Sequence, residues 1–316
     1  MMTAFTPSLR IAACLAALVA LPLAAQPVPP SRWGAADRIG AMNNLSPEAT
    51  RAAAGLVKLG RVYALGVVTG PATPVWPGRS YKIVVTPSDD GSGQPLGANR
   101  VTGHDDVLMT HVGIGSQLDG FAHIGIAHHH YNNVPARDLF APDGVRLYGT
   151  ESVPPAATRG ILLDMVKANG GKPLAPGTAF NRREIEAALK AAGLRLRPGD
   201  VVLFHTGWMG RMAEKEPLAF IASQPGLGRE GAEWLAGQGV AMVGADTAAL
   251  EAIPFERAEE PFIVHQTLLT KHGVHILENM DTGALAADGA TEFLFVLGVP
   301  RLQGTVQAII NPVAIR

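Results

Sequence analysis

The chain has 316 residues, of which 47% are hydrophobic and 17% charged, a composition typical of a globular protein with a full core. Its 26 basic and 27 acidic residues give a formal net charge of -1. Because no basic tract or charge run stands out, the sequence argues against a nucleic-acid partner and against an anionic membrane surface. We therefore expect a small-molecule substrate and self-association into a homodimer or homotetramer.

The N-terminal residues 1–25 have the features of a secretory signal peptide. Arg10 precedes the apolar run "IAACLAALVALPLAA", and small residues lead up to Ala25. The run is shorter than the roughly 20 residues of a membrane-spanning helix, so we expect a periplasmic or secreted protein with no membrane contact after cleavage. Cys14, the single cysteine, lies in this run. The mature chain 26–316 is thus expected to lack disulfides, thiolate nucleophiles and cysteine–zinc sites.

Residues 26–316 show no internal repeat or long linker, which predicts one domain. Residues 86–106 are rich in Gly, Asp and Ser, and they predict a long loop. Short apolar runs that are typical of buried strands follow at 160–166, 200–206, 240–246 and 293–299.

Two helices are predicted between these strands. The first, in "NRREIEAALKAAG", has Asn181 as its N-cap, Glu184 three residues later and Gly193 at its C-terminal end. The second spans 229–239. Strands interleaved with helices predict an α/β fold.

All ten histidines lie between residues 104 and 275. A single histidine near a strand end is usually structural. We assign no ligands within "HHH" at 128–130, which has the composition of a solvated loop. We expect His272 in a turn and His275 in the strand after it.

Two groups of residues combine imidazoles with carboxylates. Gln117, Asp119 and His123 share parity, so on an extended segment their side chains project to one side. His265 and Glu278 lie on either side of an apolar pair and a glycine turn. Carboxylates near imidazoles are common ligands of zinc and manganese. On spacing alone, each group fits a metal site and a set of structural polar residues equally well.

The segment "GIGSQLDGFAH" (113–123) resembles the hallmark His-x-Gly-Thr-His-x-Asp-x-Pro-x-His of the cyclase-like metal-dependent hydrolases, the superfamily of bacterial kynurenine formamidase and isatin hydrolase. Similarity continues through "WGAADRIGAMNNLSPE" (33–48), "LFHTGW" (203–208) and "VGADTAALE" (243–251). The resemblance implies the single-domain cyclase-like fold, a swivelling β/β/α type. It also implies that Asp119, His265 and Glu278 are metal ligands and that His123 is the catalytic histidine.

Three departures from this hallmark stand out. Gly113 and Gln117 stand where the motif has its two first histidines, and Phe121 replaces the proline. These changes argue against a two-metal site. His111 could replace a missing imidazole if the strand bulges.

We therefore expect one divalent ion, Mn²⁺ or Zn²⁺, bound by Asp119, His265 and Glu278, with the amide of Gln117 as a weak oxygen ligand. The predicted activity is hydrolysis by metal-activated water of a cyclic amide or lactone, or of an N-formyl or aryl amide, with His123 as the proton shuttle. Ser116 is a poor nucleophile candidate because "GIGSQ" is not a Gly-x-Ser-x-Gly elbow.

Two other functions stay open at this point. One is a non-catalytic periplasmic binding protein for a metal or small ligand, and the other is a cyclising or dehydrating lyase. Further residues are candidates for the substrate pocket, although aromatic residues at strand ends are more often core; they are Trp33, His111, Phe121, Phe204, His205, Trp208 and Asp246.

Overall fold

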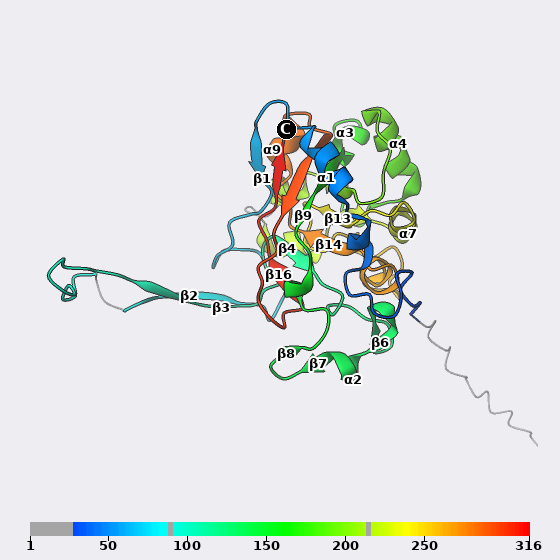
Figure 1. Cartoon of the computed structure of the whole chain (residues 1–316). Coiled ribbons are helices and arrows are strands. Elements are labelled where there is room, and N and C mark those ends of the chain that lie inside the picture. The colour runs from blue at the N-terminus through cyan, green and yellow to red at the C-terminus, as the bar shows by residue number, and fades with distance from the viewer. Residues whose placement is uncertain (1–27, 88–90, 213–215) are drawn as a thin grey trace, which may run out of the picture.

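A nine-stranded mixed sheet runs through the molecule in the order β1-β17-β15-β9-β11-β13-β14-β4-β16 (Figure 1). The computed structural model describes residues 28–87, 91–212 and 216–316. The predicted signal peptide, residues 1–25, lies outside the described residues and stays a prediction. Among the described helices, none is long and apolar enough to cross a membrane.

Four neighbouring strands at the centre of the sheet are parallel: β9 (Ala156–Asp164), β11 (Val201–His205), β13 (Met242–Ala245) and β14 (His275–Glu278). Antiparallel strands flank them on both sides: β15 (Glu292–Leu297), β17 (Val313–Ile315) and β1 (Val62–Ala64) beyond β9, and β4 (Gln117–Asp119) and β16 (Gln307–Ile309) beyond β14. The four strands predicted from apolar runs correspond to β9, β11, β13 and β15.

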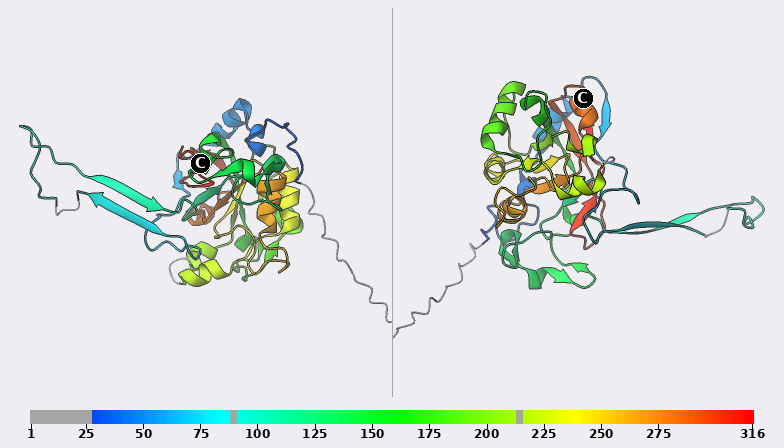
Figure 2. Two further views of the ribbon diagram at one scale, coloured as in Figure 1. Left: turned by 90° about the horizontal axis from the view of Figure 1, so that it is seen from below. Right: turned by 180° about the vertical axis from the view of Figure 1, so that it is seen from behind.

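Helices cover both faces of this sheet, as the two views of Figure 2 show. They are α1 (Pro47–Ala54), α3 (Met165–Ala168), α4 (Arg182–Ala192), α5 (Trp208–Met212), α6 (Pro217–Ala222), α7 (Arg229–Gly237), α8 (Ile263–His265) and α9 (Gly283–Ala287), with a π-helical turn η4 (Gln266–Lys271) and 3₁₀ turns η1 (Gly40–Asn44), η2 (Tyr131–Asn133) and η3 (Thr150–Ser152).

The parallel strands are buried on both faces, which explains their continuous apolar sequences. On β11, Val202 and Phe204 pack in one core with Ile185 of α4. Val201 and Leu203 alternate with them and pack in the second core. At 25 cal/mol per Å² of apolar surface, each such side chain contributes roughly 1.5–3 kcal/mol to the free energy of unfolding.

The helix α4 begins and ends at the predicted residues. The backbone N–H of Asn181 donates to Glu184 Oε2 over 3.0 Å, which is half of a capping box. Gly193 ends the helix in the left-handed conformation with φ +69°, where a residue without Cβ is favoured. The second predicted helix, 229–239, corresponds to α7.

An arm projects from the body of the molecule (Figures 1 and 2). It consists of β2 (Tyr81–Thr86) paired with β3 (Asp105–Thr110). Of the predicted loop 86–106, residues 91–104 connect to β3 without forming a strand of their own, and residues 88–90 lie outside the described residues. The two strands of the arm were missed. Three smaller ribbons complete the fold: β5 (His129–His130) with β6 (Val134–Pro135), β7 (Phe140–Ala141) with β8 (Gly144–Val145), and β10 (Ala179–Phe180) with β12 (Gly226–Leu227); the short helix α2 (Ala136–Leu139) lies between β6 and β7.

Candidate metal centre

The centre is built on strand β4, which lies between β14 and β16. Gln117 stands directly opposite Glu278 of β14, and Asp119 stands directly opposite Gln307 of β16. Residues opposite each other in an antiparallel pair share a face and bring their Cβ atoms close together. Each carboxylate of the centre therefore has an amide side chain as its cross-strand partner.

His265 reaches this group from α8, at the start of the π-helical turn η4. Its Nε2 lies 3.1 Å from Glu278 Oε1 and 3.5 Å from Asp119 Oδ2. The ligand atoms of the three residues all lie within 4.8 Å of one another. The structure thus brings together the three predicted metal ligands, Asp119 from β4 and His265 and Glu278 from a segment far along the chain.

Hydrogen bonds occupy one oxygen of each carboxylate and leave the other available. Gln307 Nε2 donates to Asp119 Oδ1 over 2.7 Å, and Gln117 Nε2 donates to Glu278 Oε2 over 2.8 Å. Asp119 Oδ2 is buried and has no hydrogen-bond partner. A buried polar atom without a partner is costly, and a cation beside Oδ2 would satisfy it.

Glu251 orients the imidazole of His265. Its Oε1 lies 2.6 Å from His265 Nδ1 and also accepts the backbone N–H of His265 over 3.2 Å. Since an ionised carboxylate can only accept, Nδ1 donates to Glu251, and Nε2 is the ring atom that faces Asp119 and Glu278. A carboxylate behind a histidine is the usual support of a metal-binding imidazole.

The charges of this centre also suit a cation. Burial, followed by the negative charge of Asp119, raises the pKa of Glu278 to about 8. Burial also raises the pKa of Asp119, but the nearby imidazoles of His123 and His265 outweigh burial and lower that pKa to about 2. Two buried carboxylates this close disfavour joint ionisation unless a positive charge lies between them. The donors present, two carboxylate oxygens and one imidazole nitrogen, fit a divalent cation.

Gln117 differs from its predicted role as an oxygen ligand. Its Nε2 donates to Glu278 Oε2 and lies 3.3 Å from Asp119 Oδ1. With its nitrogen turned toward both carboxylates, the amide holds them in place rather than offering its oxygen to the same centre. The physical reason is that a carboxylate next to an amide selects the N–H side.

His123 follows β4 after a turn closed by its own N–H, which donates to Gly120 O over 3.0 Å. The ring centroid lies 6.3 Å from that of His265. Burial lowers the pKa of His123 below its ordinary value despite the opposing charge of Asp119, with Arg79 among the further causes. The imidazole is therefore neutral at pH 7, beside the three ligand atoms but not one of them.

The surroundings of Gly113 and His111 show what replaces the first histidine of the hallmark. A Cβ at position 113 would collide with the amide of Gln307, so the side chain of Gln307 fills the space that a residue at 113 would need. His111 is exposed at the base of the arm, where its Nδ1 accepts the backbone N–H of Ser80 over 3.0 Å. The pairing of β3 is regular up to Thr110, and His111 contacts the arm through Ser80, so its role as a substitute imidazole stays a prediction.

The predicted aromatic pocket residues belong to the core instead. Phe121 is fully buried and stacks on His275 with ring centroids 4.2 Å apart. Phe204 and Trp208 are buried in two hydrophobic clusters, and Trp33 packs on the first of these. These rings lie in the core because burying their large apolar surface away from water is favourable.

Other aromatic residues, which sequence reasoning missed, adjoin His265. The ring of Phe262 lies 5.5 Å from that of His265, and Trp76 lies 6.4 Å from Phe262. Phe262 adopts φ +55°, a strained conformation for a bulky residue that often marks functional sites. In the sequence, the position of Phe262 three residues before the predicted ligand His265 is the feature that could have indicated that it lies near the centre.

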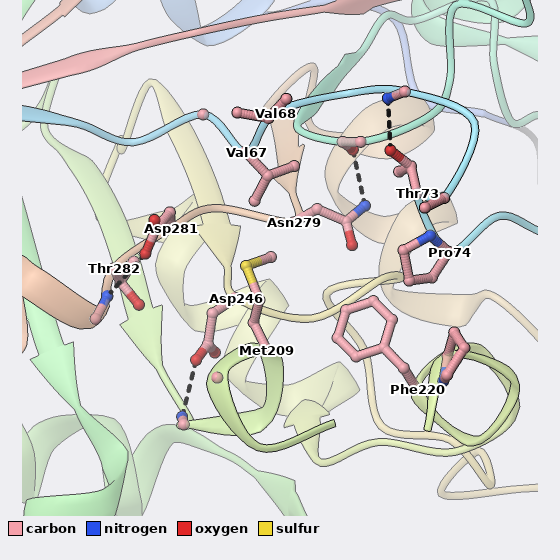
Figure 3. A pocket seen from close by; sticks show the side chains of 18 of the residues that line it. Val67, Val68, Thr73, Pro74, Met209, Phe220, Asp246, Asn279, Asp281 and Thr282 are labelled. Carbon is pink, nitrogen blue, oxygen red and sulfur yellow. Dashed lines mark hydrogen bonds between the residues drawn. The ribbon is translucent and has the colours of Figure 1, made fainter. Parts of the chain in front are cut away.

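A pocket of about 930 Å³ lies beyond the carboxyl ends of β11, β13 and β14 (Figure 3). His205 and Asp246, both predicted pocket residues, line it together with Asn279 and Phe220. His205 Nδ1 lies 2.8 Å from Thr282 Oγ1 and 3.5 Å from Asp246 Oδ2. Burial raises the pKa of Asp246. The three metal-ligand candidates do not line this pocket.

The histidines of "HHH" do not join the centre. His128 is exposed, and His129 Nδ1 lies 3.0 Å from Ala127 O. His130 Nδ1 lies 3.2 Å from Phe121 O. Their hydrogen bonds to nearby backbone give them a local structural role.

The sequence model of putative cyclases matches residues 63–252, more than half of the chain. The chain belongs to the cyclase family. A crystal structure of a novel cyclase has a TM-score of 0.81 and 28% identity, covering 90% of this chain and 96% of that chain. The predicted cyclase-like α/β fold is thereby confirmed. No curated protein matches the chain.

More distant solved structures share the cyclase fold. An isatin hydrolase bound to the product analogue thioisatinate has a TM-score of 0.61 and 16% identity, covering 85% of this chain and 98% of that chain. A predicted metal-dependent hydrolase from Bacillus stearothermophilus has a TM-score of 0.51 and 20% identity, covering 80% and 97%. At these identities the likeness concerns the fold alone.

Proposed function

We propose that this cyclase-family protein is a metal-dependent hydrolase that opens a cyclic amide or lactone, or cleaves an N-formyl or aryl amide. The observation that carries the proposal is the buried, unpartnered Oδ2 of Asp119, which faces His265 Nε2 across 3.5 Å. The names of structural relatives, an isatin hydrolase and a predicted metal-dependent hydrolase, support the same class of reaction.

Asp119, His265 and Glu278 would hold one divalent ion, Mn²⁺ or Zn²⁺. Two oxygen donors and one nitrogen donor favour manganese more than an all-imidazole set would. When bound, such an ion supplies a Lewis acid that polarises an acyl carbonyl and makes a water molecule more acidic.

His123 is the proposed proton carrier. Because burial keeps its imidazole neutral, it can accept the proton of the attacking water and deliver it to the departing nitrogen or oxygen. Gln307 Nε2 lies 3.5 Å from His123 Nε2, which limits rotation of the ring. Phe262 and Trp76 would form an aromatic wall beside His265 for a flat ring of the substrate.

The test combines metal content with turnover on a panel of lactones, cyclic imides and N-formyl amines. We expect about one ion per chain, and Asp119→Ala should lose it because one carboxylate and one imidazole remain. His123→Ala should keep the ion and lose activity by roughly 10²–10⁴-fold. His129→Ala, a histidine outside the centre, is the control and should change neither.

Several outcomes would contradict the proposal. A full complement of metal in Asp119→Ala would mean that the site lies elsewhere. A metal-loaded protein that binds panel compounds without turnover would be a binding protein. Formation of a ring or a double bond in place of a hydrolysis product would make it a lyase.

A further inference from the structure

Arg79 lies at the base of the arm, two residues before β2, and its guanidinium reaches the metal centre. Its Nη1 donates to the backbone oxygen of Gly113. Gly113 itself packs against Gln307, whose amide fills the space that a Cβ at position 113 would need and donates to Asp119 Oδ1 over 2.7 Å. Arg79 is thus anchored on the rim of the centre by one of its donors.

Arg79 has no carboxylate partner within the described ranges 28–87, 91–212 and 216–316, although its side chain is half-buried. Arg159 provides the contrast. That buried arginine is paired with Asp200 over 2.6 Å and with Glu292 over 2.7 Å. Buried guanidinium groups normally have such partners because removing the charge from water is costly. The free donors of Arg79 therefore point to a ligand.

The charge balance of the centre indicates the sign of that ligand. A divalent ion would balance the negative charges of Asp119 and Glu278, and His265 is neutral when it binds a metal. Glu251 lies behind His265 and is satisfied by its Nδ1 and N–H groups. Among the described residues, Arg79, whose charge acts on both His123 and Glu278, is then the cation at this centre without a carboxylate of its own. An anionic group of a ligand would complete that pair.

We propose that Arg79 binds a carboxylate of the acyl ligand, so that the substrate or its hydrolysis product is an anion. The planar guanidinium fork matches a carboxylate with two parallel hydrogen bonds. The donation to Gly113 O fixes the fork without using its remaining donors. The inference rests on the proposed function only in that it takes the divalent ion to be in place. Arg79 is a binding residue and moves no proton.

The test measures equilibrium binding of benzoate and of its neutral analogue benzamide to manganese-loaded protein by calorimetry at low salt. We expect benzoate to bind more tightly than benzamide. Arg79→Gln should weaken benzoate binding roughly ten- to a hundredfold, the loss typical for a hydrogen bond to a charged group, and leave benzamide binding unchanged. Arg79→Lys keeps the charge but loses the fork, so its affinity for benzoate should lie between the two.

Arg38→Gln is the matched control, since Arg38 Nη1 donates to Ala35 O and Asp37 O and its guanidinium lies over the ring of Tyr148. Manganese content and melting temperature are recorded for every variant. If Arg79→Gln does not fold, Arg79→Lys against wild type still tests the fork. The inference is overturned if metal-loaded wild type and folded Arg79 variants bind benzoate equally.

The assay also separates this inference from the proposed function. Binding needs no turnover, so Arg79-dependent binding of benzoate by a protein inactive on the whole panel would retain the inference and reject the hydrolase. If the protein hydrolyses a panel compound but its affinity for benzoate does not depend on Arg79, the hydrolase proposal is retained and the inference about Arg79 is rejected. If the wild type is active, the Arg79 variants show where the carboxylate lies. A higher KM for anionic substrates, with product inhibition unchanged, places it on the substrate. Weaker product inhibition, with KM unchanged, places it on the product.

Discussion

Gln307 stands directly opposite Asp119 in the β16–β4 pair, and its Nε2 donates to Asp119 Oδ1 over 2.7 Å. This bond leaves Oδ2 as the free oxygen of the carboxylate, turned toward His265 and Glu278. The same side chain fills the space beside Gly113. One glutamine therefore both orients the carboxylate of a candidate metal ligand and explains why a glycine precedes β4.

Gln307→Met is expected to weaken metal binding by roughly ten- to a hundredfold, the usual effect of losing a group that orients a metal ligand. Methionine keeps the length of the side chain but has no N–H to hold Asp119. The measurement is competition with a chelator that reports free metal. Gln238→Met, at the C-terminal end of α7, is the control, and equal metal affinity in both variants would contradict the orienting role.

Glu251→Gln is expected to lower metal affinity to a similar extent. The ionised carboxylate fixes the tautomer of His265 through the 2.6 Å contact with Nδ1, and a neutral amide does so less strongly. Glu233→Gln is a matched control because Glu233 also contacts a histidine, His272 Nε2, over 2.6 Å, but outside the centre. Titration with Mn²⁺ followed by calorimetry separates the two; an unchanged Kd in Glu251→Gln would rule out the support role.

The sequence predicts local features of this fold well and cross-strand partners poorly. Asn181, Glu184 and Gly193 define α4 because helix caps act within a few residues. The parity of Gln117 and Asp119 correctly places both on one face of β4. Gln307, in contrast, meets Asp119 across 188 residues of sequence, and spacing carries no information about such a pair.

The roles of side chains depend on partners that the sequence does not reveal. Gln117 has the right place for an oxygen ligand, but the carboxylates around it select its N–H group. Phe121 lies within the hallmark segment, and yet its ring is covered by Tyr131 and His275. Arg79 and Phe262 lie outside every recognised motif, so only the packing of their segments brings them to the centre.

Acid should destabilise the protein partly through Asp37. Burial raises its pKa, but hydrogen bonds from Tyr131, Ser31, Ile39 and Asn43 outweigh it and hold the pKa below its ordinary value of 3.8. The folded state therefore binds this proton less readily than the unfolded state. The stabilisation is fully present above pH 3.8 and is lost as the pH falls through the lower folded value.

Asp37→Asn should lower the free energy of unfolding at pH 7 by about 1–3 kcal/mol, because an amide cannot accept the same set of bonds. The difference between wild type and variant should shrink as the pH falls below 3.8. Urea unfolding at pH 7, 5 and 3 measures it. Asp138→Asn, at an exposed ion pair with Arg137, should show little effect at any pH. A difference independent of pH would mean that Asp37 acts without its charge.

The arm of β2 and β3 leads to the last prediction, which concerns self-association. Ile83 and Leu108 are directly opposite each other on the ribbon and are 48% and 51% exposed. A two-stranded ribbon is marginal by itself in water, and exposed apolar strands are common contact surfaces. We propose that the arm packs against a second copy of the chain in a homodimer or homotetramer.

The double variant Ile83→Lys with Leu108→Glu tests this directly. The two new side chains form an opposite-charge cross-strand pair, which keeps the ribbon paired while removing two of its exposed apolar side chains. Sedimentation equilibrium should give an oligomer for wild type and a monomer for the variant, with manganese content unchanged because the centre lies on β4 and β14. A charge swap at the exposed pair Arg182 and Glu186 of α4 controls for surface charge. A monomeric wild type, or a variant that associates as strongly as wild type, would remove the arm from the interface.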